Sequence, residues 1–166
     1  MTNGLESQIE KVIIPSSVTS IGDSAFSGCI NLTEITLPDN VTSIGNKAFS
    51  GCINLTEIKI PDSVTSVGNN AFSGCTKLTE IIIPDSVTSL SNSAFSGCTI
   101  KKLIVGNNSK SITYNMTNGL EDQIEKVIIP SSVTSVRYNA FYGCKKLTEI
   151  TIPDSVTSIL LNLKLA

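Results

Sequence analysis

The chain has 166 residues, of which 40% are hydrophobic and 5% aromatic, with 12 basic residues, 14 acidic residues and no histidine. A formal net charge of −2 provides no basic stripe for nucleic acid, so no nucleic-acid partner is expected. No apolar run reaches the ~20 residues that a membrane span needs. The first residues, MTNGLESQIEK, also lack a basic stretch followed by an apolar one, so this segment shows neither membrane insertion nor a signal peptide.

A period of 23 residues runs through the chain. The sequence AFSGC recurs with its phenylalanine at Phe26, Phe49, Phe72 and Phe95, and it returns as AFYGC at Phe141, two periods later. A fixed period of this length predicts a solenoid, in which each unit is one supersecondary element stacked on the previous one. The phenylalanines are expected to form a buried column along its axis.

Each unit contains a predicted strand of the form apolar-x-x-apolar-x-apolar, rich in Ile, Thr and Val. The clearest copy is LTEITLP at Leu32–Pro38, and the copy at Ile100 has Gly106 in place of proline. The last two apolar residues are two apart, so they share a face and are expected to point inward. Proline cannot donate to a ladder and marks the strand end. The seven expected strands begin at Ile9, Leu32, Leu55, Leu78, Ile100, Ile124 and Leu147.

The second half of each unit reads SVTSIGNNAFSGC or a close variant. The spacing of Val64 and Val67 predicts an extended segment that returns to the core. The spacing of Ala71, Phe72 and Cys75 predicts a short helical turn. A glycine before the cysteine is expected to relax the corner that leads to the next strand.

One unit is irregular, because the segment GNNSKSITYN at 106–115 lacks the AF and C signature. We expect a complete but distorted turn there. Ile112, Met116 and Leu120 are expected to take the inward places that Ile44, Ala48 and Cys52 hold in a regular turn.

A longer repeat is also present, since residues 1–15 return at 116–130 with one change, five periods later. We expect a single array over 1–166 of about seven turns, with an irregular turn at 106–123 and an incomplete turn at each end. Solenoids normally carry polar caps, because an open end exposes core. Either this chain is a piece of a longer array, or the end is closed by Leu160, Leu161, Leu163 and Leu165.

The pattern LxxIxIPxxVxxIxxxAFxxC resembles the BspA-like, or Treponema-type, leucine-rich repeats over nearly the whole chain. The resemblance implies a leucine-rich repeat solenoid: a curved right-handed superhelix with a parallel β-sheet on the concave face, and extended segments and short helical turns on the other sides. It also implies a cell-surface or secreted location and adhesion to host proteins or other cells. In place of the buried asparagine ladder of commoner leucine-rich repeats, a largely hydroxyl ladder is expected at Ser17, Asn40, Ser63, Ser86, Ser132 and Ser155.

The five cysteines share one position of the unit, with neighbours expected about 5 Å apart. They are odd in number and point inward in parallel, so we interpret them as buried free thiols, with disulfides as the alternative. No CxxC pair or histidine supports a metal site, and the lack of histidine removes the usual general base. Neither an enzyme nor a cofactor is expected. The cysteines are Cys29, Cys52, Cys75, Cys98 and Cys144.

The strand positions that differ between turns mark the candidate binding site. One outward slot holds isoleucine in three consecutive turns, and an exposed apolar strip often marks a contact site. The neighbouring slot holds three successive glutamates, which indicate either a basic partner or simple copying of the unit, with a small basic patch of Lys101, Lys102 and Lys126 beside them. The predicted protein-binding residues are Ile82, Ile104, Ile128, Glu57, Glu80, Lys102 and Lys126.

We therefore interpret the chain as the protein-binding module of a cell-surface adhesin, which engages host or partner-cell proteins through the concave strand face. The alternative is a structural array without a foreign ligand, which associates with itself end to end.

Overall fold

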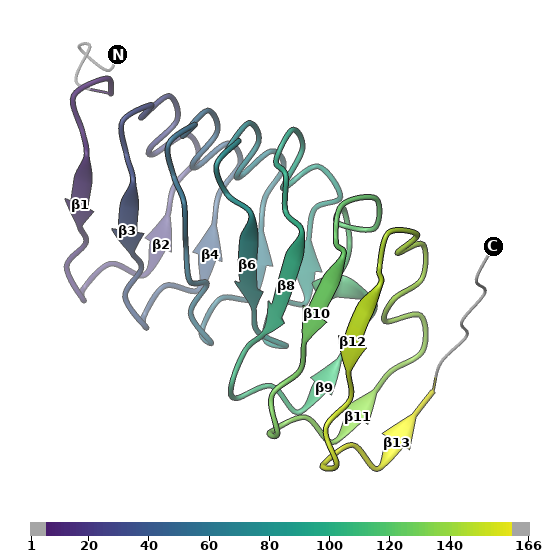
Figure 1. Ribbon diagram of the computed structural model, residues 1–166. Helices are drawn as coiled ribbons and strands as arrows, with labels where there is room; N and C mark the ends of the chain where they lie inside the picture. Colours follow the sequence, from purple (N-terminus) through teal and green to yellow (C-terminus); the bar gives the residue numbers. More distant parts are fainter. Residues whose placement is uncertain (1–5, 161–166) are drawn as a thin grey trace.

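The computed structural model describes residues 6–160, which form a solenoid of stacked turns joined by two ladders of parallel strands (Figure 1). The first ladder contains β1 (Lys11–Ile13), β3 (Glu34–Thr36), β6 (Glu80–Ile83), β8 (Lys102–Val105), β10 (Lys126–Ile128) and β12 (Glu149–Thr151). The second ladder contains β2 (Ser20–Ile21), β4 (Ser43–Ile44), β5 (Ser66–Val67), β7 (Ser89–Leu90), β9 (Ser111–Ile112), β11 (Ser135–Val136) and β13 (Ser158–Ile159).

Successive turns lie in register, so equivalent side chains form columns along the solenoid. Ile82 of β6 is opposite Ile104 of β8, which is opposite Ile128 of β10. Six of the seven expected strands form, and the seventh, near Leu55, contributes two isolated parallel bridges between β3 and β6. The parallel, in-register stacking predicted from the period is therefore confirmed.

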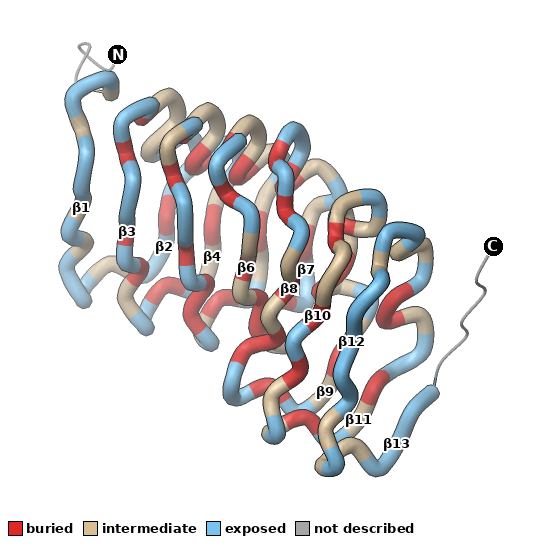
Figure 2. Tube along the Cα trace, in the orientation of Figure 1, coloured by how far each residue is buried: buried red, intermediate tan, exposed pale blue. Residues whose placement is uncertain are grey.

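The core runs through the middle of the turns as the 23-residue pattern predicts. The inward strand residues Ile81 and Ile83 are 1% and 0% exposed, and the returning residues Val64 and Val67 are also buried. Along β6 and β8, buried residues alternate with residues that face outward (Figure 2). This alternation fixes which side chains of each strand reach the solvent.

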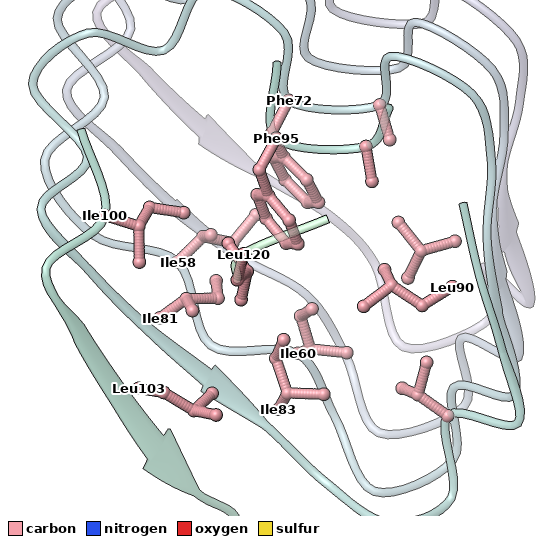
Figure 3. Packing of buried hydrophobic residues seen from close by; sticks show 14 of the residues in the cluster. Ile58, Ile60, Phe72, Ile81, Ile83, Leu90, Phe95, Ile100, Leu103 and Leu120 are labelled. Atoms are coloured by element: carbon pink, nitrogen blue, oxygen red, sulfur yellow. The ribbon is translucent and has the colours of Figure 1, made fainter. Parts of the chain in front are cut away.

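The phenylalanines stack as a spine within this core. The ring centroids of Phe26 and Phe49 lie 5.3 Å apart, those of Phe49 and Phe72 5.3 Å apart, and those of Phe72 and Phe95 5.2 Å apart. Phe72 and Phe95 lie with their rings parallel beside the inward isoleucines in Figure 3. Phe141 is also buried. The predicted buried column is thus confirmed, except that Phe26 at its end is half-buried.

The predicted short helical turn at the AFSGC segment is wrong as a helix, since these segments form successive hydrogen-bonded turns instead. The residue before alanine adopts a left-handed conformation at Asn70 (φ 55°), and so does the corner glycine, Gly74 (φ 75°). The backbone N–H of Phe72 donates to Ala94 O in the next turn (2.8 Å), and that of Gly74 to Ser96 O (2.8 Å). Donors used between turns cannot form the i to i−4 bonds of a helix.

The cysteines pack as free thiols in the described structure, four of them buried and Cys144 half-buried. The Sγ of Cys75 donates to Phe49 O at 3.2 Å, and that of Cys98 donates to Phe72 O at 3.0 Å. Burial raises the pKa of Cys52 to about 12, so this thiol is protonated at neutral pH. The free-thiol interpretation is confirmed.

The expected hydroxyl ladder is wrong as a continuous feature. Ser63 Oγ donates to Val41 O (2.6 Å), and Ser155 makes the equivalent bond. The hydroxyl of Ser86, by contrast, is buried without a hydrogen-bond partner. The residue before Ser86 is instead bonded to the following turn, because Asp85 N donates to Ser109 Oγ at 3.0 Å. Ser132 is also unpartnered, and nothing in the structure explains it.

The irregular turn interrupts the second ladder between β7 and β9, while the first ladder continues from β6 to β12. Its predicted inward residues, Ile112, Met116 and Leu120, are all fully buried, so this prediction is confirmed. The turn also contains the only helix among residues 6–160, the 3₁₀ helix η1 (Tyr114–Met116). A fully buried Thr117 follows it, whose Oγ1 donates to Ala140 O at 2.9 Å.

Side-chain amides replace the ladder bonds that the irregular turn lacks. In regular turns, backbone N–H groups donate to Thr42 O and Ile44 O. Across the interruption, the Nδ2 of Asn115 donates to Thr88 O (2.9 Å), and the Nδ2 of Asn118 donates to Leu90 O (2.5 Å). These bonds satisfy the carbonyl of Thr88, directly before β7, and that of Leu90 at its end. A backbone carbonyl left without a partner would destabilise the stack.

Candidate functional site

The outward side of the first ladder, called the strand face here, is formed by two columns of side chains. The first column is Ile13, Thr36, Lys59, Ile82, Ile104, Ile128 and Thr151, and the second is Lys11, Glu34, Glu57, Glu80, Lys102, Lys126 and Glu149. All seven residues proposed from the sequence belong to these columns.

The isoleucine strip is continuous but only partly exposed. Ile82, Ile104 and Ile128 lie opposite one another on three neighbouring strands. Ile128 is 39% exposed, while Ile82 and Ile104 are half-buried. Their exposed surfaces form a shallow apolar stripe, narrower than the sequence pattern alone implies.

Ion pairs between turns run along the second column. Lys11 Nζ lies 3.3 Å from Glu34 Oε1, Glu80 pairs with Lys102, and Lys126 pairs with Glu149. These side chains keep about a third or more of their surface in solvent, so each pair stabilises the fold by only about 0–1 kcal/mol. Their main consequence is to balance charge along the face.

The expected basic patch at Lys101, Lys102 and Lys126 is therefore wrong. Each of these lysines pairs with a glutamate of an adjacent turn, Lys101 with Glu125 at 3.3 Å. The physical reason is the register itself, which places opposite charges of neighbouring turns about one strand spacing apart.

A hollow of about 270 Å³ opens on the strand face beside Glu57. It lies where the first ladder is reduced to the bridges of Glu57 and Lys59, and Glu80 and Ile82 line its far side. Glu57 forms no ion pair within residues 6–160, unlike the glutamates on either side of it. The hollow therefore presents negative charge next to the apolar strip.

No group of three or more His, Cys, Asp or Glu side chains among residues 6–160 is placed to hold a metal ion. No described helix is long and apolar enough to cross a membrane. The strand face can offer shape, charge and apolar contact to a partner.

The parallel ladders, the inward columns and the 23-residue turn define a leucine-rich repeat solenoid. Six copies of the BspA type leucine-rich repeat region match residues 5–121 and 120–163. The chain belongs to this family, whose members are bacterial surface proteins built on a non-enzymatic repeat scaffold, consistent with a protein-interaction module. The resemblance noted from the sequence is confirmed.

Solved structures share the fold. The T. pallidum leucine-rich repeat protein TpLRR is 26% identical, with a TM-score of 0.61 over 90% of this chain and 72% of that one. The pneumococcal vaccine antigen PcpA is 23% identical, with a TM-score of 0.58, and the match covers 91% of this chain and 36% of PcpA. No curated protein has a matching sequence.

One further solved structure, a TLR13–ssRNA13 complex, also shares the fold. TLR13, in its complex with ssRNA13, is 21% identical, with a TM-score of 0.52, over 88% of this chain and 24% of that one. A likeness at this level of identity shows the fold alone.

Sequence reasoning missed the ion pairs and the hollow for different reasons. The ion pairs could have been predicted, since lysine and glutamate follow each other in adjacent turns of one slot, as Glu80 and Lys102 do. The hollow beside Glu57 could not be predicted, because the strand sequence LTEIKIP that begins at Leu55 differs little from neighbouring copies that form full strands.

Proposed function

We propose that this chain is the protein-binding part of a cell-surface adhesin and that the strand face engages a protein of a host or partner cell. The observation that carries the proposal is the strip of Ile82, Ile104 and Ile128, which holds apolar surface in solvent beside a charge-balanced row. Contiguous exposed apolar surface of this kind often marks an interaction site. A surface location follows from the same proposal, and membership of a family of bacterial surface proteins supports it.

The mechanism is rigid display of side chains on a stacked lattice. Each strand is bonded to copies one turn away, so the backbone of the face is ordered before a partner arrives. Binding then loses little conformational entropy of the module, which favours affinity for a given contact area. Glu57, Glu80, Lys102 and Lys126 flank the strip and orient a partner that presents complementary charges.

The test replaces the three isoleucines with serine in one variant. The chain, immobilised on beads, is exposed to detergent-solubilised proteins from surface-biotinylated cells, and the retained biotin signal is measured. We expect the triple variant to lose at least about nine-tenths of the signal, because removal of an apolar anchor at an interface typically weakens binding by about tenfold or more.

A matched control uses isoleucines that are exposed elsewhere. Ile30 and Ile53, 40% and 43% exposed, lie on the turns and outside the strand face, so Ile30→Ser with Ile53→Ser should retain the full signal. Circular dichroism confirms that both variants fold. Equal retention by the wild type and the strand-face variant refutes the proposed site.

A structural, self-associating array is the second candidate. It is favoured by Ile150 and Ile152, which occupy inward slots of the repeat yet are 36% and 38% exposed at and just after β12. Stacking another copy on this turn would bury them. Light scattering over a concentration series measures this association, and a monomer at millimolar concentration excludes it.

A further inference from the structure

A second hollow, of about 360 Å³, lies at the ends of three strands of the second ladder and outside the strand face. Thr113, Tyr114 and Asn115 line it from the irregular turn, Arg137 and Tyr138 from the segment after β11, and Leu160 directly follows β13. The tyrosines are well exposed, at 39% for Tyr114 and 59% for Tyr138. We call this the tyrosine hollow.

The composition of the tyrosine hollow departs from the repeat. It contains the chain's single arginine and two of its three tyrosines, and the third, Tyr142, is four residues beyond Tyr138. At the place of Arg137, regular turns have Gly22, Gly45 and Gly68, and at the place of Tyr138 they have Asp or Asn. The residues of this hollow therefore differ from the repeated unit, whereas most other positions of the array are copies of it.

The irregular turn makes room for these large side chains. The N–H of Arg137 donates to Ile112 O (2.9 Å), just as Gly68 N donates to Ile44 O (2.9 Å), so the two residues are equivalent. A Cβ on Gly68 would lie 2.8 Å from Asn46 N, so this regular turn has no room for a side chain, and the next turn carries only the small Ser91 at the same place. The irregular turn, on which Arg137 stacks, forms η1 at this place instead of the regular backbone path.

The charges of the hollow define what it can bind. Arg137 is exposed and forms no ion pair within residues 6–160, and Tyr114 Oη donates to Glu121 Oε1 at 3.2 Å. A guanidinium offers a planar fork of donors that matches a carboxylate. Tyrosine and arginine are also enriched among residues that dominate binding energy at protein interfaces.

We propose that the tyrosine hollow binds an acidic segment of a protein partner. A carboxylate of that segment pairs with Arg137, and an adjacent apolar side chain packs against Tyr114, Tyr138 and Leu160. The volume of about 360 Å³ accommodates one or two side chains of such a segment. This site is independent of the strand face and of the function proposed for it.

The experiment measures fluorescence anisotropy of a labelled peptide of alternating Asp and Leu residues, and of a matched peptide with Asn in place of Asp. We expect the wild-type chain to bind the acidic peptide at least about tenfold more tightly than the neutral one, because a charge-assisted pair contributes about 1.5 kcal/mol or more. Arg137→Gln should abolish this preference, and Tyr138→Asn, which restores the residue of a regular turn, should weaken binding of both peptides.

Two controls show whether the binding depends on this hollow. Lys77→Gln removes an exposed positive charge elsewhere, and the strand-face triple serine variant removes the isoleucine strip, so both should bind the acidic peptide as the wild type does. Unchanged peptide affinity in Arg137→Gln overturns the proposal. Arg137-dependent binding of sialyllactose without binding of the peptide also overturns it, since the hollow would then recognise a sugar acid.

Discussion

Replacing Phe72 with alanine tests the role of the phenylalanine column. Phe72 is fully buried, and its ring is stacked on Phe49 at 5.3 Å and on Phe95 at 5.2 Å. A buried Phe→Ala change costs about 3–5 kcal/mol, and each aromatic pair contributes about 0.5–1.5 kcal/mol beyond its buried area. With two pairs lost, we expect the free energy of unfolding to fall by about 4–5 kcal/mol, near the top of the range.

The matched variant is Phe26→Ala, at the same position of the repeat. Phe26 is half-buried and stacks on Phe49 alone, so about 2 kcal/mol is expected. Urea unfolding is followed by far-ultraviolet circular dichroism for the whole stack and by tyrosine fluorescence for residues 114–142, where all three tyrosines lie. Coincident transitions justify a single free energy. Equal losses in the two variants, or a loss below about 2 kcal/mol for Phe72→Ala, would refute the stacking argument.

Two further predictions concern the glycine column and the thiols. Gly45→Ala should destabilise the fold by about 1–3 kcal/mol, since its Cβ would lie 2.7 Å from Asp23 N, whereas Gly22→Ala meets no atom within 4 Å and should be nearly neutral in the same urea assay. Because burial raises the pKa of Cys52 from an ordinary 9.0 to about 12, the unfolded chain loses this proton first as pH rises. The free energy of unfolding should therefore decrease between pH 9 and 12 and not below, and Cys52→Ala should flatten that decrease; an unchanged slope contradicts the assignment.

The regular turns were predictable because a repeat averages out local ambiguity. One copy of the strand is too short to identify securely, but aligned copies place Ile81 and Ile83 inward, and both are buried. A helix at Ala71–Cys75 was predicted wrongly, because spacings of one and three fit a helix and a series of hydrogen-bonded turns equally. The left-handed conformation of Asn70, which decides between them, leaves only a weak signal in the residue type.

The candidate sites were predictable to different degrees. The columns of the strand face follow directly from the period, as the register of Ile82 and Ile104 shows. The amide bonds of the irregular turn could not be predicted from the sequence, since no regular copy has an equivalent of the bond from Asn118 to Leu90 O. The tyrosine hollow did leave a signal in Arg137 and Tyr138, at positions that hold Gly or Ser and Asp or Asn in the four regular turns from Gly22 to Asn92.

Near-identical turns create an ambiguity during folding, because a strand can pair with the wrong copy and skip a whole coil at little energetic penalty. The irregular turn reduces this degeneracy. Its amides at Asn115 and Asn118 bond the carbonyls of Thr88 and Leu90, and a regular copy stacked in its place would lack these two bonds. The least regular turn therefore distinguishes one junction of the array from all the others in the described part of the chain.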